Sequence, residues 1–367
     1  MKSFLFGPFV FLLLSSTASG LGSVVSRFYV YNKSYYTWQE AQTYCRSFHT
    51  DLAILLELSD GDQMVMEQYD AWTGLHRSGE STEADDWKWS AGSKLLYSEW
   101  ALDEPNSTDR CAYVHYDSRK FYRADCQEYY YFICHYVWDN GWSPRFITLS
   151  KTWSDAREHC RKYYRDLMYY PTASHLKNVN RINFPVWIGL HRDGDTWKWS
   201  TGSSDFRRWS SSTAADNGDC AFIYSSNKKM ATRNCYERLP FICVDDNVLL
   251  VKESKTWEEA LEHCRGLASS ASSQPQYDLL SVQPGEDHHY IMGKAMKADT
   301  EELWVGLRFL AGHWLWVTGA DMLYTDLPEC PLEGSHCGAL TKTNMTIMET
   351  RDCTEKKNFL CYKTENV

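Results

Sequence analysis

Cysteine is the residue type whose number and spacing first suggest chemistry in this 367-residue chain, which contains thirteen cysteines. Twelve of them fall into three sets of four, and in each set an outer pair brackets an inner pair 15 or 16 residues apart. In an exported chain this pattern predicts disulfides, because oxidising compartments let them persist and small domains need them. The inner pairs are Cys111 and Cys126, Cys220 and Cys235, and Cys337 and Cys353.

Four cysteines permit three pairings, so their number alone does not determine the connectivity. The repetition of the sets favours an outer bridge in each one, which would stabilise each unit by roughly 4 to 5 kcal/mol on a chain-entropy estimate. The expected outer bridges are Cys45 with Cys134, Cys160 with Cys243, and Cys264 with Cys361. Cys330 is left over, and it is a free thiol, part of a local bridge or an intermolecular link.

Patterns that support catalysis are missing from the sequence. It contains no His-Glu-x-x-His, no glycine-rich phosphate-binding loop and no Gly-x-Ser-x-Gly. The formal net charge of -10 argues against nucleic acid or an anionic membrane as a partner, because both call for clustered basic surface. We therefore expect a protein that binds a ligand and is not an enzyme.

The N-terminus has the features of a signal peptide. Lys2 is followed by an apolar stretch from Phe4 to Leu14 and by small residues that end at Gly20, so residues 1–20 are assigned to the signal. No second apolar run is long enough to cross a bilayer. We expect a secreted, extracellular glycoprotein without a transmembrane segment. Its three acceptor sites for N-glycans are Asn32, Asn106 and Asn344.

The elements that must position these residues recur three times along the chain. Each repeat opens with Thr-Trp, an acid two residues after the Trp, and then Ala and Cys, which predicts an N-capped helix with one buried face. Strand signals follow, with tryptophans at period two that we interpret as core residues. The helix residues are Trp38, Ala41 and Cys45, then Trp153, Ala156 and Cys160, then Trp257, Ala260 and Cys264. The repeats predict three domains at 27–136, 145–244 and 247–364, and the short linkers predict a fixed array.

These motifs together resemble the C-type lectin-like domain. The resemblance rests on the Trp-x-x-Ala-x-x-x-Cys helix, on Trp187-Ile188-Gly189-Leu190, on the Trp-Lys-Trp-Ser at residues 87–90 and 197–200, and on the four-cysteine frame. It implies an α+β fold with two helices, small antiparallel sheets and a long loop in each of three tandem domains. The arrangement resembles that of mannose-receptor-type proteins without their membrane anchor.

The resemblance also implies a ligand set in the first repeat. In sugar-binding members of the family, a Glu-Pro-Asn, a nearby acid and an Asn-Asp pair hold one Ca²⁺ that also binds sugar hydroxyls. Glu104, Asn106 and Asp109 match part of this set, with Glu104 and Asn106 as the carbohydrate-binding residues. Tyr122 and Arg123 replace the Asn-Asp pair, and a guanidinium close to the cation would weaken its binding.

Two hypotheses follow from this incomplete site. The first is a secreted lectin that binds mannose-type glycans or glycoproteins through Ca²⁺ in the first repeat. The second is a Ca²⁺-independent array that binds protein ligands. Because venom relatives join two chains through an extra loop cysteine, the resemblance also suggests a disulfide-linked dimer through Cys330.

Overall fold

Over the residues that it describes, the computed structural model shows an α+β protein with three seven-stranded sheets. Residues 1–20, Asn106 and Asn344 lie outside the described residues, so the signal peptide and two glycosylation sites are not described. Within the described ranges, no helix is long and apolar enough to cross a membrane. These ranges are 25–66, 68–77, 86–93, 95, 99–105, 108–138, 141–176, 182–201, 204–211, 218–267, 277–283, 286–343 and 348–363.

The third repeat folds on itself, and we call this part module C. Its sheet has the order β15-β21-β17-β19-β20, with β16 paired to β21 and β18 paired to β17. The elements are β15 (Val248–Lys255), α5 (Trp257–Gly266), β16 (Tyr277–Leu279), α6 (Glu286–Ala295), β17 (Glu302–Leu310), β18 (His313–Trp316), β19 (Cys337–Thr341), β20 (Met348–Arg351) and β21 (Lys357–Lys363).

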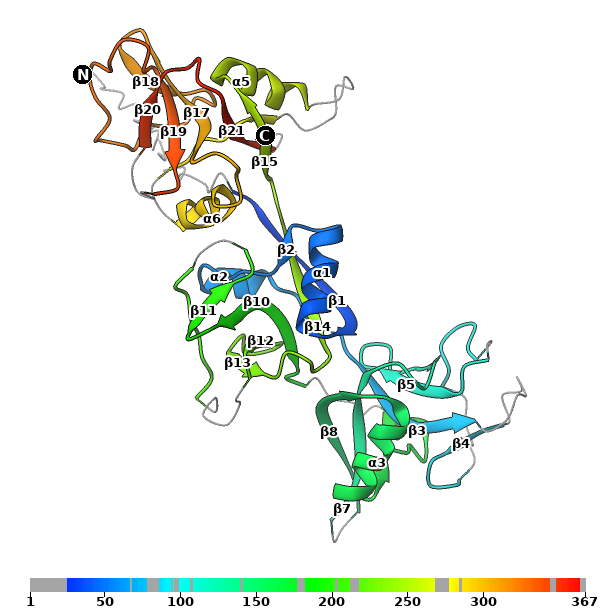
Figure 1. Cartoon of the computed structure of the whole chain (residues 1–367). Coiled ribbons are helices and arrows are strands. Elements are labelled where there is room, and N and C mark those ends of the chain that lie inside the picture. The colour runs from blue at the N-terminus through cyan, green and yellow to red at the C-terminus, as the bar shows by residue number, and fades with distance from the viewer. Residues whose placement is uncertain are drawn as a thin grey trace, which may run out of the picture.

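The first half of repeat one combines with the second half of repeat two, and we call this assembly module A. Its sheet has the order β1-β14-β10-β12-β13, with β2 on β14 and β11 on β10. Repeat one supplies β1 (Arg27–Tyr36), α1 (Trp38–Phe48), β2 (Asp51–Leu52) and α2 (Leu58–Gln63). Repeat two supplies β10 (Pro185–Asp193), β11 (Thr196–Trp199), β12 (Cys220–Tyr224), β13 (Met230–Arg233) and β14 (Leu239–Asp246). In Figure 1 the blue α1 and β1 lie beside the green β10 and β14.

The remaining halves of the same two repeats form module B. Its sheet has the order β6-β5-β3-β7-β8, with β4 on β3 and β9 on β7. Repeat one supplies β3 (Asp70–Arg77), β4 (Trp87–Trp89), β5 (Cys111–His115), β6 (Phe121–Ala124) and β7 (Tyr130–Trp138). Repeat two supplies β8 (Gly141–Lys151), α3 (Trp153–Tyr163), β9 (Asp166–Leu167) and α4 (Ala173–Leu176).

The first helix of each module is capped and packed as its sequence predicts. Thr37, Thr152 and Thr256 each accept a hydrogen bond from the backbone N–H three residues on. In α1 and α5 the acid at that position, Glu40 or Glu259, accepts a hydrogen bond in return from the backbone N–H of the Thr, which completes a capping box. The Trp, Ala and Cys of each helix are buried, so they form the core-facing side of the helix. Of the period-two tryptophans, Trp87, Trp89, Trp199 and Trp316 are buried as core residues, whereas Trp197 and Trp314 are half-buried. The preceding strand tryptophans Trp72, Trp187 and Trp304 are fully buried.

Equivalent hydrogen bonds of these helix tryptophans show the exchange between repeats one and two. In module C, the indole of Trp257 donates to the carbonyl oxygen of Val305 in its own repeat at 2.9 Å. The indole of Trp38 instead donates to Ile188 in repeat two, and that of Trp153 donates to Thr73 in repeat one, both at 2.8 Å. The same local contact is therefore made across repeats in modules A and B.

The exchange overturns two of the expected outer disulfides. The structure pairs Cys45 with Cys243 and Cys134 with Cys160, so the predicted bridges Cys45–Cys134 and Cys160–Cys243 are wrong. The other bridges stay within their repeats, at Cys111–Cys126, Cys220–Cys235, Cys264–Cys361 and Cys337–Cys353.

The physical reason for this pairing is the hairpin formed by β7 and β8. The two strands are antiparallel, and their register runs from Trp138 opposite Gly141 to Tyr130 opposite Lys151. Because β8 folds back onto β7, it carries the following helix α3 and its Cys160 to module B. The C-terminal half of repeat two is then completed by the N-terminal half of repeat one.

Module C is fixed to module A through a buried ion pair. The ammonium group of Lys294 on α6 donates to Asp246 and to the carbonyl oxygen of Val248, both at 2.5 Å. The hydroxyl of Tyr290 donates to the other oxygen of Asp246 at 2.6 Å. Burial lowers the pKa of Lys294, and the adjacent Asp246 carboxylate opposes that shift. These contacts hold two neighbouring modules in one arrangement.

Candidate functional site

The described part of the Glu-Pro-Asn loop, up to Pro105, lies against strand β6 of module B. Trp100, at the start of the loop, forms an isolated bridge with Phe121 at the start of β6. The ring of Trp100 packs edge-on against Trp87, with 4.7 Å between the centroids. These aromatic contacts hold the loop so that Glu104 faces Arg123 on β6.

Arg123 occupies the middle of the sequence-predicted ligand set. Its guanidinium donates to the Glu104 carboxylate at 2.7 Å and lies 3.6 Å from that of Asp109. The side chains of Glu104 and Arg123 are mostly buried, whereas that of Asp109 is 38% exposed. Burial raises the pKa of Glu104, and the guanidinium of Arg123 opposes this shift. The structure thus brings Glu104 and Asp109 together around one internal cation.

This arrangement does not fit a Ca²⁺ ion. Ca²⁺ takes six to eight oxygen ligands, whereas here the two carboxylates face a fixed positive charge. Tyr122, at the other position of the expected Asn-Asp pair, stacks on Tyr113 with 5.5 Å between ring centroids and supplies no carboxylate or amide oxygen. Among the described residues, no group of three or more acidic, histidine or cysteine side chains could hold a metal. Asn106, the third expected ligand, lies outside the described residues.

The corresponding loops of the other repeats lack the same constellation in their described parts. In repeat two, Asp219 forms an exposed ion pair with Arg192, with 2.6 Å between Nε and Oδ1. In repeat three, Cys330 is exposed and forms no disulfide within the chain. Its thiol is therefore accessible for an intermolecular bond, as the sequence suggests.

A second polar site was missed in the sequence. Asp70, the first residue of β3, is 3% exposed and lines a cavity of about 400 Å³ between modules A and B. No motif marks this residue. A comparison of the residue two positions before the strand tryptophan in each repeat, which is Asp70, Pro185 or Glu302, could have shown that two repeats carry an acid there.

A family model decides the classification of the chain. The model described as "Lectin C-type domain" matches residues 34–136, 149–245 and 253–363. The chain belongs to the C-type lectin family. Each match follows one sequence repeat, so the lectin domains defined by sequence differ from modules A and B, in which halves of two lectin domains combine.

Relatives of this C-type lectin include receptors much longer than this chain and shorter proteins that match one part of it. Human C-type mannose receptor 2 is 22% identical over 396 residues, which cover 89% of this chain and 26% of the receptor. Mouse lithostathine-1 is 28% identical over 131 residues, covering 32% of this chain and 78% of the relative. Among solved structures, the C-type lectin CEL-I from Cucumaria echinata is 19% identical, covering 32% of this chain and 90% of that one, with a TM-score of 0.29.

Proposed function

We propose that this protein is an extracellular binding protein that recognises protein ligands without Ca²⁺, with its lectin domains serving as a scaffold. One observation carries the proposal. The Arg123 guanidinium takes the position between Glu104 and Asp109 that a Ca²⁺ ion would need. An ion pair built into the fold keeps this surface intact at any Ca²⁺ concentration, so recognition there depends on the side chains alone.

The second candidate is Ca²⁺-dependent binding of mannose-type glycans through repeat one. Two carboxylates that already face a single cation, those of Glu104 and Asp109, favour it. For this function, Arg123 would have to leave both carboxylates and expose them to the incoming ion. Breaking a partly buried pair of this kind costs about 1 to 3 kcal/mol, which a weakly coordinated ion would have to offset.

Calorimetric titration of CaCl₂ into the full chain distinguishes the two candidates. We expect no saturable heat, and no binding to mannan that depends on Ca²⁺. The matched variant combines Tyr122→Asn and Arg123→Asp, which restore the missing oxygen ligands, with Thr108→Ala, which removes the sequon and keeps the Asn106 amide. This variant should gain saturable Ca²⁺ binding and should melt at a higher temperature when Ca²⁺ is added.

The opposite result would establish the second candidate. If the unmodified chain binds Ca²⁺ with saturation, if mannose strengthens that binding, and if Glu104→Ala abolishes it, the proposal of Ca²⁺-independent recognition is wrong. Thr108→Ala alone serves as the control for the glycan, because it leaves Tyr122 and Arg123 unchanged. Its comparison with the unmodified chain separates the effect of the glycan from that of the ligand set.

A further inference from the structure

The first residue of β3, Asp70, is a buried carboxylate with incomplete neutralisation. Its nearest cation is the ammonium of Lys33 on β1, 3.5 Å from Oδ2, and the Lys33 side chain is 55% exposed. His115 Nε2 lies 4.0 Å from Oδ1, and no donor among the described residues is within hydrogen-bonding distance of that oxygen. Burial raises the pKa of Asp70, and Lys33 and His115 oppose the shift. A buried carboxylate whose charge is only partly neutralised is stabilised by an additional cation.

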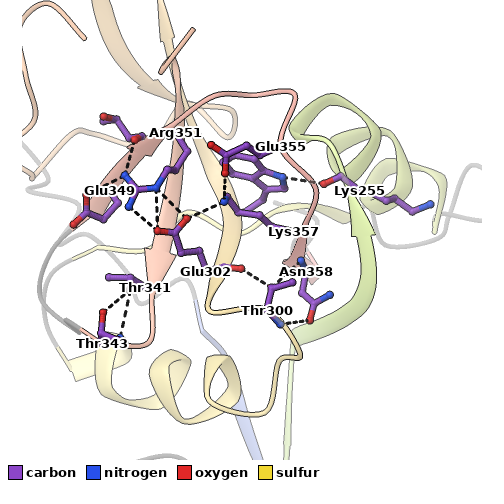
Figure 2. A network of polar contacts seen from close by, with 12 residues as sticks. Lys255, Thr300, Glu302, Thr341, Thr343, Glu349, Arg351, Glu355, Lys357 and Asn358 are labelled. Atoms are coloured by element: carbon purple, nitrogen blue, oxygen red, sulfur yellow. Dashed lines mark hydrogen bonds and ion pairs between the residues drawn. The ribbon is translucent and has the colours of Figure 1, made fainter. Parts of the chain in front are cut away.

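Module C shows how the same position is neutralised when the fold supplies its own cations. Glu302 begins β17 two residues before Trp304, as Asp70 begins β3 two residues before Trp72. Figure 2 shows Glu302 held by two cations, Arg351 at 2.6 Å and Lys357 at 2.8 Å. The Lys357 ammonium also lies over the Trp304 ring, 5.1 Å from its centroid. In module C the charge of the acid is therefore neutralised by side chains of the same module.

Both of these cations are missing from the equivalent positions of module B. Arg351 lies opposite Cys337 in the sheet of module C, and Ala124 lies opposite Cys111 in that of module B. Lys357 stands two residues before the core Phe359, and Tyr130 stands two residues before Phe132. Repeat one thus carries the acid, with an alanine and a tyrosine at the positions where module C has the two cations.

The walls of the cavity around Asp70 suit an organic cation. The rings of Tyr113 and Tyr130 stack with 4.8 Å between centroids, and Tyr35 meets Tyr130 edge-on at 5.5 Å. Because Tyr113 also stacks on Tyr122, these rings form an apolar wall that suits the aliphatic part of a lysine or arginine side chain, and the charge is left to Asp70. Glu128 adds a second carboxylate at the exposed edge, where it accepts a hydrogen bond from Tyr130.

The other cation that lines the cavity already has its own partners. Arg238 forms a two-point ion pair with Glu40, at 2.8 and 3.0 Å. Its guanidinium also lies over the ring of Tyr129, 4.9 Å from the centroid. The charge of Arg238 is therefore paired with Glu40 of module A, and it does not neutralise Asp70.

We propose that this cavity binds one ammonium or guanidinium group from a lysine or arginine side chain of a protein partner, which takes the place of Lys33 beside Asp70. The inference adds a ligand chemistry to the proposed recognition of proteins. The Asp70 cavity is separate from the Glu104 site. If the Ca²⁺ titration contradicts the proposed function, the cation-binding proposal is unaffected, and if the cation probes fail to bind, the proposed function is unaffected. The cavity volume of about 400 Å³ admits one such side chain together with water.

Calorimetric titration of the full chain with small probes tests the proposal. The probes are Nα-acetyl-lysine methylamide and Nα-acetyl-arginine methylamide, with the uncharged Nα-acetyl-norleucine methylamide as the control ligand. We expect saturable binding of the two cations only. Lys33→Ala, which removes the internal competitor, should tighten binding about two- to fivefold, and Asp70→Asn should weaken it at least tenfold.

Glu302→Gln is the matched control variant, because it alters the equivalent acid in module C and should leave probe binding unchanged. Absence of saturable binding in both the unmodified chain and Lys33→Ala would overturn the proposal, whether or not Asp70→Asn folds. Binding that Asp70→Asn leaves unchanged would overturn it as well. Methylammonium serves as the free-amine probe, and if it binds as tightly as the lysine derivative, the assignment to a protein side chain is wrong.

Discussion

Cutting the chain between β7 and β8 should leave its two pieces covalently joined. A protease recognition sequence inserted between Trp138 and Gly141 provides the cut, in a Cys330→Ser background that removes the exposed thiol. Both Cys45–Cys243 and Cys134–Cys160 cross this point. After thiols are blocked, a denaturing gel without reductant should show a single band of full mass, which separates into two bands on reduction.

The sizes of the two closed loops predict unequal contributions to stability. Cys134–Cys160 closes 26 residues and Cys45–Cys243 closes 198. On the chain-entropy estimate, the first contributes about 3.5 kcal/mol and the second about 5 kcal/mol to the free energy of unfolding. Replacing both cysteines of one bridge by alanine avoids an orphan thiol. In urea titrations, the Cys45→Ala, Cys243→Ala variant should therefore lose about 2 kcal/mol more than the Cys134→Ala, Cys160→Ala variant.

A control cut shows whether the gel reports connectivity. The same recognition sequence inserted between Asp246 and Val248 separates module C, and among the disulfides none crosses that point. This cut should give two bands without reductant. Two bands without reductant after the cut between β7 and β8 would refute the exchange, because bridges confined to each repeat leave that cut uncrossed.

Two further predictions concern Cys330 and Asp70. If Cys330 links two chains, electrophoresis without reductant should show a band of twice the mass that Cys330→Ser removes, and a band of single mass from the unmodified chain would contradict the dimer. A raised pKa means that folded Asp70 holds its proton more tightly than the unfolded chain does, so its contribution favours folding at low pH and is lost as the pH rises above 3.8. Thermal melts should show Asp70→Asn gaining stability relative to the unmodified chain across this rise, and a difference that is constant with pH would argue against a buried, poorly neutralised charge.

Local structure could be predicted well from the sequence because its signals are local. The Thr cap, the Trp and Ala of the helix face and its Cys lie within nine residues, and the structure forms the predicted helix in all three repeats. The placement of Arg123 beside Glu104 also followed from motif spacing. Each of these features depends on neighbours in the chain or on one well-defined strand pairing.

The choice of partner between repeated halves could not be predicted, because the repeats offer identical chemistry. The indole of Trp38 needs a backbone carbonyl, and both Thr73 and Ile188 present one at the same place in the fold. Cys45 likewise meets a cysteine in either arrangement. The Asp70 cavity was missed for a related reason, since it lies between modules and its walls come from β1, β3 and β5 together.

The exchange also sets the order in which this protein can be completed during its synthesis. Cys45 leaves the ribosome 198 residues before its partner Cys243, a delay of about 10 to 40 s at ordinary rates of translation. During that interval Cys134 emerges and could capture Cys45 in the wrong bridge. The closure of Cys134 with Cys160, only 26 residues later, removes this competitor. A polypeptide that stops after repeat one would lack Cys160, so Cys134 would remain able to bond Cys45, and the first two repeats must therefore be synthesised together.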